Sequence, residues 1–408
     1  MAVKTTDTVW KIVGCVRHYA WGGRRFIPAI TCLANEEEQP YAELWYGQHP
    51  DCTSTTTGGS SLAELMASRP EKFLTPEERN RWEDRLPYLC KILDVDDMLS
   101  IQIHPDKTQA EAGYHSEDDA GIPLTAVHRT FRDRNHKPEL MFALSEFYLL
   151  HDFRPETDML QQLASHGTLE KISSKISDLG LPAFFNLYMT LSQDRINNLL
   201  RPFVTSLLEK NIPEEPENPD YWARRAVDRF CSLEKIDRGI LAFYLLNLIR
   251  LSPGDVVFQD NGIPHAYLSG QNIEVMSNSD NVIRGGLTSK YIDSAAMSDL
   301  VRYDKRQIHR LFPTKIDDTR VVFTPPIPEF NLSVIDLKPY QEYEIDITGI
   351  SILFSTVNCF MIRTLYQELR ISGGEAALAR AGESLVLMCR TSAQIFLVST
   401  QGAEAEGR

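Results

Sequence analysis

The stretch that decides the fold spans residues 254–290 and reads GDVVFQDNGIPHAYLSGQNIEVMSNSDNVIRGGLTSK. A Pro-Gly-Asp turn leads into an apolar run at 256–258, which predicts a buried β-strand. Gly270 is expected to turn the chain into a second strand over 271–276. Because side chains alternate along a strand, Glu274 shares one face with Asn272 and Met276.

The same stretch carries an unusual density of side chains capable of chemistry. His265 follows Pro264, which restricts the backbone on both sides, so the imidazole sits on a locally stiff segment at a strand end. The other such side chains are Glu274, Asp280, Arg284 and Lys290. One imidazole, two carboxylates and two cations within one hairpin predict a site for a metal and an anion.

Length and composition predict a folded protein of several domains. The chain has 408 residues, which corresponds to two or three ordinary domains. Hydrophobic residues make up 43% and charged residues 24%, within the range of globular proteins. The net charge of −14 argues against nucleic acid as a partner, because no segment offers a basic stripe. An anionic substrate would require positive charge gathered locally.

Cysteine usage and apolar runs predict a cytoplasmic protein without a membrane partner. The seven cysteines are scattered without a C-x-x-C pair, which predicts free thiols in a reducing compartment. The N-terminus lacks the apolar region of a signal peptide. The longest apolar run, 240–249, predicts a mostly buried helix and is shorter than the roughly 20 residues that span a bilayer.

Two further strand ends carry possible metal ligands. In residues 100–104 (SIQIH), alternation places Ser100, Gln102 and His104 on one face, although a surface strand would give the same pattern. Pro138 stiffens the segment before Glu139, which opens another apolar run. These positions lie where strands end, and ligands are often held there.

Two neutral imidazoles and one carboxylate form the usual protein ligand set of a catalytic zinc. His104, His265 and Glu139 supply that set, and Gln102 adds a neutral amide oxygen. The same set would also suit non-haem iron. No nucleotide-binding or serine-nucleophile motif stands out, which disfavours nucleotide-driven and acyl-transfer chemistry.

Two residues in the first fifty are further candidates for contact with a substrate. Trp21 stands beside two glycines and is either a core aromatic at a turn or a platform for a sugar. Glu43 lies in an apolar, strand-like context, where a carboxylate requires a partner.

The pattern changes twice after residue 154. Residues 155–251 are helical in period, without a ligand constellation; His166 is interpreted as a surface histidine. Pro202 is expected to kink or split its helix. From residue 320 onward, short β-rich runs separated by turn residues predict a small antiparallel barrel or sandwich.

Several long motifs resemble one known family, type I mannose-6-phosphate isomerase. These motifs are YAWG (19–22), YAELWYGQHP (41–50), SIQIHPDK (100–107), NHKPEL (135–140), PHAYLSG (264–270) and SDNVIRGGLTSKYID (279–293). The resemblance covers about residues 10–300, and the C-terminal third matches only in its β-rich character. Ser289 stands where the family commonly has proline, and no motif residue is missing.

The resemblance implies a mainly β fold with an α insertion. A cupin (jelly-roll) β-barrel would form the catalytic domain from residues 1–154 and 252–315. Residues 155–251 would form an inserted helical domain, and 316–400 a second, cupin-like β domain followed by a polar tail at 401–408. It further implies one Zn²⁺ per chain, held by Gln102, His104, Glu139 and His265, with Arg284 as the catalytic arginine.

The implied activity is the interconversion of mannose 6-phosphate and fructose 6-phosphate, in carbohydrate metabolism and GDP-mannose biosynthesis. A proton moves between C2 and C1 through a cis-enediol, and Arg284 can stabilise the charge that develops. Candidate proton-transfer residues are Glu274, Asp280, His136 and Lys137. Candidates for the phosphate are Lys91, Ser100, Lys137, Arg284 and Lys290. Candidates for further substrate contacts are Trp21, Glu43 and Tyr267.

Two alternatives stay open from the residues alone. A non-haem iron cupin dioxygenase would use His104, Glu139 and His265. It would leave Gln102, Arg284 and Lys290 without a shared task. A non-catalytic cupin that binds sugar phosphates would bind without turnover. We expect a small-molecule sugar phosphate as the partner and a monomer or weak homo-oligomer.

Overall fold

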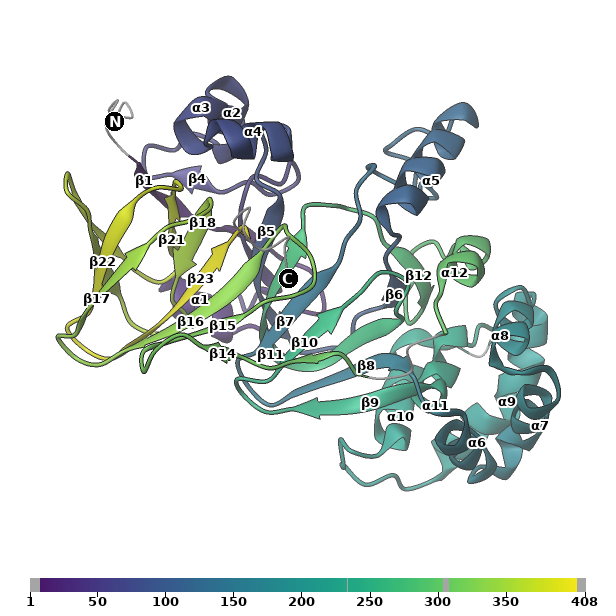
Figure 1. Cartoon of the computed structure of the whole chain (residues 1–408). Helices are drawn as coiled ribbons and strands as arrows, with labels where there is room; N and C mark the ends of the chain where they lie inside the picture. Colours follow the sequence, from purple (N-terminus) through teal and green to yellow (C-terminus); the bar gives the residue numbers. More distant parts are fainter. Residues whose placement is uncertain (1–7, 233, 304–307, 402–408) are drawn as a thin grey trace.

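The computed structural model describes residues 8–232, 234–303 and 308–401. A large sheet lies at its centre, with the C-terminal strands at one end and a group of helices at the other (Figure 1). The main path of the large sheet is β13 (Arg310–Leu311), β10 (Val256–Gln259), β7 (Glu139–Ala143), β11 (His265–Ser277), β5 (Tyr88–Val95), β3 (Glu43–Tyr46) and β2 (Cys15–Arg17). Four strands branch from it, namely β6 (Ile101–Ile103), β12 (Ile283–Gly286), β8 (Phe147–Phe153) and β9 (Leu246–Leu251).

Strand β11 is the spine of this sheet. Its first half pairs with β8 and β6, and its second half with β5 and β7. Gly270 lies in the middle with φ +122°, where a Cβ would come within 2.5 Å of the Glu146 carbonyl oxygen. The expected turn at Gly270 is therefore wrong. The glycine instead lets one continuous strand pass from one set of partners to the other.

Alternation along β11 separates the core from a cavity. Ile273 and Val275 pack into the apolar core between the large sheet and the eight-stranded sheet. Glu274 lies on the opposite face and lines the cavity. On β5, Ile92 joins the same core while Lys91 lines the cavity. The period of two thus places charged side chains inside the barrel and apolar ones between the sheets.

Two further sheets form the end rich in C-terminal strands. The eight-stranded sheet runs β14 (Thr314–Lys315), β15 (Arg320–Phe323), β16 (Asn331–Leu337), β23 (Ala393–Ser399), β18 (Ser351–Phe354), β21 (Glu375–Ala379), β1 (Val9–Val13) and β4 (Thr55–Thr56). The four-stranded sheet runs β17 (Glu342–Asp346), β22 (Ser384–Met388), β19 (Phe360–Arg363) and β20 (Glu368–Ile371). The N-terminal β1 thus pairs with β21, far along the chain. Of the predicted polar tail, only Gln401 lies within the described residues.

The helices outside the insertion are α1 (Phe26–Thr31), α2 (Leu62–Ser68), α3 (Pro70–Phe73), α4 (Pro76–Trp82), α5 (Lys107–Asp119) and α12 (Ser294–Leu300). Apart from α5, the helices outside the insertion have seven residues or fewer. The insertion contains α6 (Glu156–Ala164), η1 (Gly167–Leu169), α7 (Glu170–Leu179), α8 (Leu181–Met189), α9 (Gln193–Glu209), α10 (Pro219–Phe230), η2 (Arg238–Leu241) and α11 (Ala242–Leu245). Its core is continuous with one face of β6, β8 and β12. None of the helices in the described ranges is long and apolar enough to cross a membrane.

The apolar run at 240–249 does not form the single helix expected. The helical part ends at Leu245, and the chain continues as strand β9. The reason is that β8 offers a free edge with which β9 pairs, Phe147 lying opposite Leu251. Of the two outcomes expected at Pro202, a kink or a split, the split does not occur. Helix α9 continues through Pro202, with Leu200 and Phe203 buried on either side. In both places tertiary packing overrides the local signal.

His166 is buried, not a surface histidine as predicted. Its side chain is 8% exposed, and Nε2 lies 3.1 Å from Asp220 Oδ1. The rings of Phe203 and Tyr244 meet it edge-on at 5.3 and 5.1 Å between centroids. The helices of the insertion therefore enclose a polar pair whose members are too far apart in sequence for the local pattern to show.

The prediction of seven free thiols is also wrong, because Cys15 and Cys52 form a disulfide. Cys15 lies on β2 opposite Trp45 of β3, and the loop after β3 brings Cys52 back to the same place. The two cysteines are 37 residues apart, a separation that carries no pairing signal. The other five cysteines are free thiols.

Candidate functional site

A cavity of about 640 Å³ opens on the inner face of the large sheet. Eleven of the candidate residues line it: Trp21, Glu43, Lys91, Ser100, Gln102, Lys137, Glu139, Glu274, Asp280, Arg284 and Lys290. They come from strands β3, β5, β6, β7, β11 and β12 and from the loops between them. Side chains that are distant from one another in the sequence therefore face one space.

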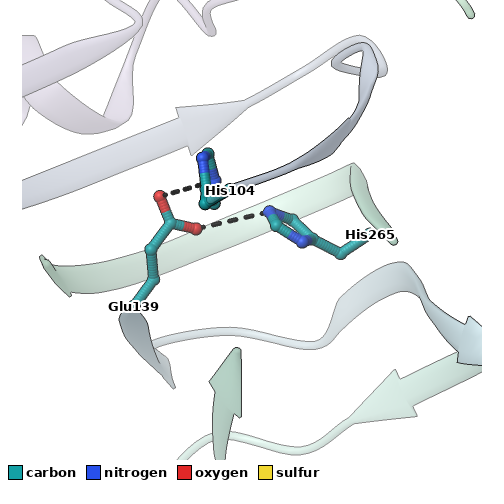
Figure 2. A group of neighbouring side chains, drawn as sticks. All are labelled: His104, Glu139 and His265. Carbon is teal, nitrogen blue, oxygen red and sulfur yellow. Dashed lines mark ion pairs between the residues drawn. The ribbon is translucent and has the colours of Figure 1, made fainter. Parts of the chain in front are cut away.

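Two histidines and a glutamate meet beside this cavity (Figure 2). His104 directly follows β6, while Glu139 and His265 begin β7 and β11. Nε2 of His104 lies 3.3 Å from Glu139 Oε1, and Nε2 of His265 lies 3.4 Å from Oε2. All three side chains are fully buried. The ligand set expected from three strand ends is thus gathered around one point.

Backbone carbonyls fix how the two imidazoles face the glutamate. Nδ1 of His104 lies 2.7 Å from the Asn281 carbonyl oxygen, and Nδ1 of His265 lies 2.9 Å from that of Ile263. In a neutral imidazole the nitrogen that faces a carbonyl carries the proton, so Nε2 presents its lone pair. Two lone pairs directed at a carboxylate repel it unless a cation lies among them. This orientation is the one that metal-binding histidines adopt.

The spacing and charge of the cluster fit Zn²⁺. Charge-assisted hydrogen bonds are about 2.7–2.9 Å long, shorter than the separations found here. Two ligands about 2.0–2.2 Å from a tetrahedral zinc lie about 3.4 Å from each other, which matches them. Burial lowers the pKa of His104 to about 4 and so keeps it neutral. Burial acts to raise the pKa of Glu139, but Lys137 and the histidines outweigh it and hold that pKa well below its usual range.

Gln102 lies next to this cluster by strand register. It pairs with His265 of β11 on one side and with Arg284 of β12 on the other. Residues directly opposite each other on antiparallel strands point to the same face, so these three side chains share the inner face of the sheet. Gln102 is therefore placed to supply a fourth ligand, with Arg284 beyond it.

Two of the three lysines expected at the phosphate, Lys91 and Lys137, are held by carboxylates at the buried end of the cavity. Nζ of Lys91 lies 3.0 Å from Glu274 Oε2, and Nζ of Lys137 lies 3.2 Å from Glu139 Oε1. Burial acts to lower the pKa of Lys91, but Glu274 and Glu43 outweigh it and raise that pKa. Lys91 thus stays charged, and each lysine is neutralised locally, so neither is a free anchor for phosphate.

Tyr267 and Glu43 are explained by their hydrogen bonds. The Tyr267 hydroxyl donates to Glu274 Oε1 at 2.9 Å and accepts from Gln259 at 2.6 Å. It stands behind Glu274, outside the cavity lining, so a direct sugar contact by Tyr267 is not supported. Glu43 does line the cavity and accepts a hydrogen bond from the Trp45 indole. Burial raises the pKa of Glu43, which favours its protonated form.

A cluster of cations occupies the more exposed end of the cavity. Arg284 and Lys290 were expected there, and Arg132 joins them. Burial lowers the pKa of Arg284, and the like charge of Arg132 lowers it further. The pKa of Lys290 is lowered by burial and then by both arginines. Within the described part of the chain, none of the three forms an ion pair with a carboxylate.

Arg132 was missed by the sequence reasoning. It lies in the loop before β7, and its backbone N–H donates to Asn281 Oδ1 at 2.7 Å. The basic segment FRDRNHK (131–137), which ends in the lysine of the NHKPEL motif, was the only signal present. That segment contains two arginines, and the sequence does not show which one faces the cavity.

His136 and Asp280 are candidate bases with opposite surroundings. His136 lies outside the cavity lining, and its Nε2 is 2.6 Å from Oε1 of Glu329, in the loop before β16. Asp280 lines the cavity, and its Oδ1 lies 3.2 Å from Nε2 of His49. Burial acts to raise the pKa of Asp280, but His49 outweighs it and lowers that pKa. Asp280 is thus an ionised carboxylate facing the cavity, whereas His136 lies outside the cavity lining and is paired with Glu329.

A jelly-roll barrel that gathers two histidines and a glutamate beside a polar cavity defines a metal-binding protein of the cupin class. Comparisons with known proteins identify the family. Residues 9–156 match the phosphomannose isomerase type I catalytic domain. Because a relative is 33% identical over almost the whole chain, the chain belongs to the type I phosphomannose isomerase family.

That relative is the mannose-6-phosphate isomerase of Salmonella typhimurium, matched over 92% of this chain and 96% of the relative. The enzyme of Escherichia coli K12 is 31% identical with the same coverage, and that of Rattus norvegicus is 29% identical over 91% and 93%. A zinc-bound mannose 6-phosphate isomerase structure matches with a TM-score of 0.84 at 30% identity, over 97% of this chain and 100% of that one. The Salmonella typhimurium structure bound to substrate and zinc matches with a TM-score of 0.83 at 30% identity, with the same coverage. The predicted fold is confirmed.

Proposed function

We propose that the protein is a zinc-dependent mannose-6-phosphate isomerase that interconverts mannose 6-phosphate and fructose 6-phosphate. One observation carries this proposal: a buried cluster suited to Zn²⁺ and a cluster of cations without carboxylate partners in the described chain face the same cavity. The first suits a carbonyl or hydroxyl group, and the second suits a phosphate. Relatives that are isomerases match almost the full chain, which supports the isomerase over the dioxygenase and the non-catalytic cupin.

The metal ligands that we assign are His104, Glu139 and His265, with Gln102 as the fourth. Both histidines present lone pairs from Nε2, and Glu139 is ionised. When bound, Zn²⁺ supplies Lewis-acid polarisation of the sugar carbonyl and stabilises negative charge on oxygen. Lys137 neutralises part of the Glu139 charge, which leaves the site more electrophilic than an unpaired carboxylate would.

The phosphate-binding group that we assign consists of Arg132, Arg284 and Lys290, called the outer cations below. None of the three has a carboxylate partner in the described chain, and their mutual repulsion is relieved when a dianion binds. Arg284 also lies next to Gln102, between the outer cations and the metal ligands. Its permanent charge is therefore placed to stabilise the oxygens of the enediol as they become negative.

Asp280 is the candidate that we favour for transferring the proton between C2 and C1. Glu274 has both carboxylate oxygens engaged, one by Lys91 and the other by Tyr267. Lys137 is paired with Glu139, and His136 lies outside the cavity lining with its Nε2 beside Glu329. Asp280 is ionised and accessible, so it can take a proton from one carbon and return it to the next.

The walls between the two ends suit a sugar. Trp21 lines the cavity and stacks on Tyr19 at 5.8 Å between ring centroids, which makes an apolar platform. Glu43 and Ser100 add hydrogen-bonding groups along the same space. We therefore assign Trp21 to the sugar face, and Glu43 and Ser100 to its hydroxyls.

A coupled assay of mannose 6-phosphate conversion tests the proposal. The zinc-loaded protein is expected to turn over, a chelator to abolish turnover, and Zn²⁺ to restore it. Oxygen uptake with the same protein should stay at background. Conversion that persists unchanged after the metal has been removed, or the absence of conversion by a protein with one bound zinc, would overturn the proposal.

We further propose that the protein works in the cytoplasm and supplies mannose 6-phosphate for GDP-mannose. Support comes from the charge of sugar phosphates, which keeps them in the compartment where they are made. We also propose a monomer or weak homo-oligomer, because the assigned metal ligands and the outer cations meet within one chain, so the site needs no residue from a partner. Cell fractionation and light scattering at working concentration test these two points.

A further inference from the structure

His49 is a buried histidine in the cavity wall whose role is not yet accounted for. It lies in the loop between β3 and β4, is 3% exposed, and lines the cavity beside Asp280. Its ring meets Trp45 edge-on, with 5.1 Å between centroids and an interplanar angle of 89°. Packing against Trp45 therefore fixes the plane in which the imidazole lies.

The protonation pattern of His49 is the reverse of that of the metal-facing histidines. The backbone N–H of Asp51 donates to Nδ1 of His49 at 3.2 Å, so Nδ1 is the acceptor. In the neutral ring Nε2 then carries the proton and faces Asp280 Oδ1 at 3.2 Å. His49, Asp51 and Asp280 approach each other closely enough to hold a cation, but His49 offers a proton where a metal ligand would offer a lone pair.

The rest of Asp280 is fixed from the other side. Its backbone N–H donates to Asp133 Oδ2 at 2.6 Å, and the Ser279 hydroxyl donates to the same carboxylate. Asp133 thus holds the main chain, while His49 holds one carboxylate oxygen. In the described chain the second oxygen of Asp280 has no hydrogen-bond partner, which leaves it for the substrate.

We propose that His49 is a positioning residue that orients the Asp280 carboxylate for proton transfer during the isomerase reaction. This inference rests on the proposed function and on the assignment of Asp280 within it. A carboxylate on a loop can rotate about χ1 and χ2, and one directed N–H removes that freedom. The cost of losing His49 should therefore appear in the chemical step and only through Asp280.

The test is a double-mutant cycle on the full-length, zinc-loaded protein, with kcat and KM for mannose 6-phosphate as readouts. The variants are His49→Leu, His49→Gln, Asp280→Asn and the double change His49→Leu/Asp280→Asn. His49→Leu should lower kcat by about tenfold to a hundredfold, with KM within about twofold and zinc content unchanged. His49→Gln keeps an N–H donor and should recover most of the loss. The double variant should be no slower than Asp280→Asn alone, because the two residues act as one unit.

Several outcomes would overturn the inference. Equal losses in His49→Leu and His49→Gln, or losses that multiply in the double variant, would show that His49 acts independently of Asp280. A second zinc lost with His49 would show that it is a metal ligand. Full activity of Asp280→Asn would remove the assignment on which the inference rests, while leaving the isomerase activity itself demonstrated. If His49→Leu fails to fold, the same cycle is run with His49→Gln, for which the inference predicts a small loss that vanishes in the Asp280→Asn background.

Discussion

The two ends of the cavity treat charge in opposite ways. At the buried end each lysine faces a carboxylate, Lys91 with Glu274 and Lys137 with Glu139. At the exposed end the outer cations, Arg132, Arg284 and Lys290, face one another. This difference fits the proposed function: a protein of net charge −14 neutralises positive charge beside the proposed metal site and concentrates positive charge at the proposed phosphate site.

The largest effect should follow from removing a metal ligand at the buried end of the cavity. His265→Ala removes a metal ligand, so zinc content should fall from about one per chain to near zero. Loss of several kcal/mol of charge stabilisation corresponds to a fall in kcat/KM of about a thousandfold or more. Metal analysis and the coupled assay measure both. The matched control is His166→Ala, which removes a buried histidine of the helical insertion and should keep zinc and activity. Retention of zinc by His265→Ala would contradict the assigned ligand set.

Arg284 lies between the two ends of the cavity, and its loss should affect the chemical step without affecting zinc binding. Arg284→Ala should keep zinc and lower kcat by about a hundredfold to a thousandfold, since it removes charge stabilisation of the enediol. Arg284→Lys keeps the charge without the planar fork and should be intermediate. If Arg284→Ala also loses zinc, the residue supports the metal site and the assignment of its role is wrong.

The pH dependence of stability should expose the buried histidines. His104 has a folded pKa of about 4 against an unfolded value near 6.5, so between these values the unfolded state binds a proton that the folded state does not. The free energy of unfolding of the metal-free protein should therefore fall as the pH falls through this window, by about 1.4 kcal/mol per pH unit for this group. Denaturant titrations from about pH 7 to about pH 4.5 measure it. An unchanged slope in His104→Gln would contradict this account.

The smallest effect should come from the exposed edge of the outer cations. Arg132→Ala should raise KM for mannose 6-phosphate by about tenfold or less with kcat within about twofold, because the contact is partly solvated. The increase should shrink at high ionic strength, where surface charge is screened. Arg134→Ala is the control, since Arg134 lies outside the cavity lining. Its guanidinium carbon lies 5.0 Å from the centroid of the Tyr114 ring. Equal behaviour of the two variants would remove Arg132 from the phosphate group.

The features predicted correctly from sequence depend on local rules. Alternation in residues 100–104 puts Gln102 on the same face as His104, and Pro138 and Pro264 stiffen the segments from which Glu139 and His265 begin their strands. A cupin barrel then brings these strand ends together. The resemblance to a family supplied the rest of the ligand assignment. Local pattern and family motif agree at these positions. The structure brings together the two imidazoles and the carboxylate, as expected.

The features that escaped prediction depend on pairs distant in sequence. His136 meets Glu329 across 193 residues, and Cys15 meets Cys52 across 37. Lys91 was assigned to phosphate because its partner Glu274, 183 residues away, was not visible in the sequence. Neither composition nor periodicity contains information about such pairs. The partners of Lys91, His136 and Cys15 are therefore visible only in the three-dimensional structure.

Strand pairing explains the errors in secondary structure as well. Gly270 resembles a turn residue, yet β5 and β7 continue the hydrogen-bond ladder beyond it. The run at 240–249 resembles a helix, yet β8 provides an edge for its second half. In each case hydrogen bonds to a distant strand decided the conformation.

The most direct test of the account is anomalous diffraction at the zinc edge from crystals grown with Zn²⁺ and fructose 6-phosphate. The account predicts one strong peak about 2.0–2.2 Å from Nε2 of His104, Nε2 of His265 and a carboxylate oxygen of Glu139, with the phosphate against the outer cations. A principal peak at His49, Asp51 and Asp280, or a phosphate bound by Lys91 and Lys137, would contradict it.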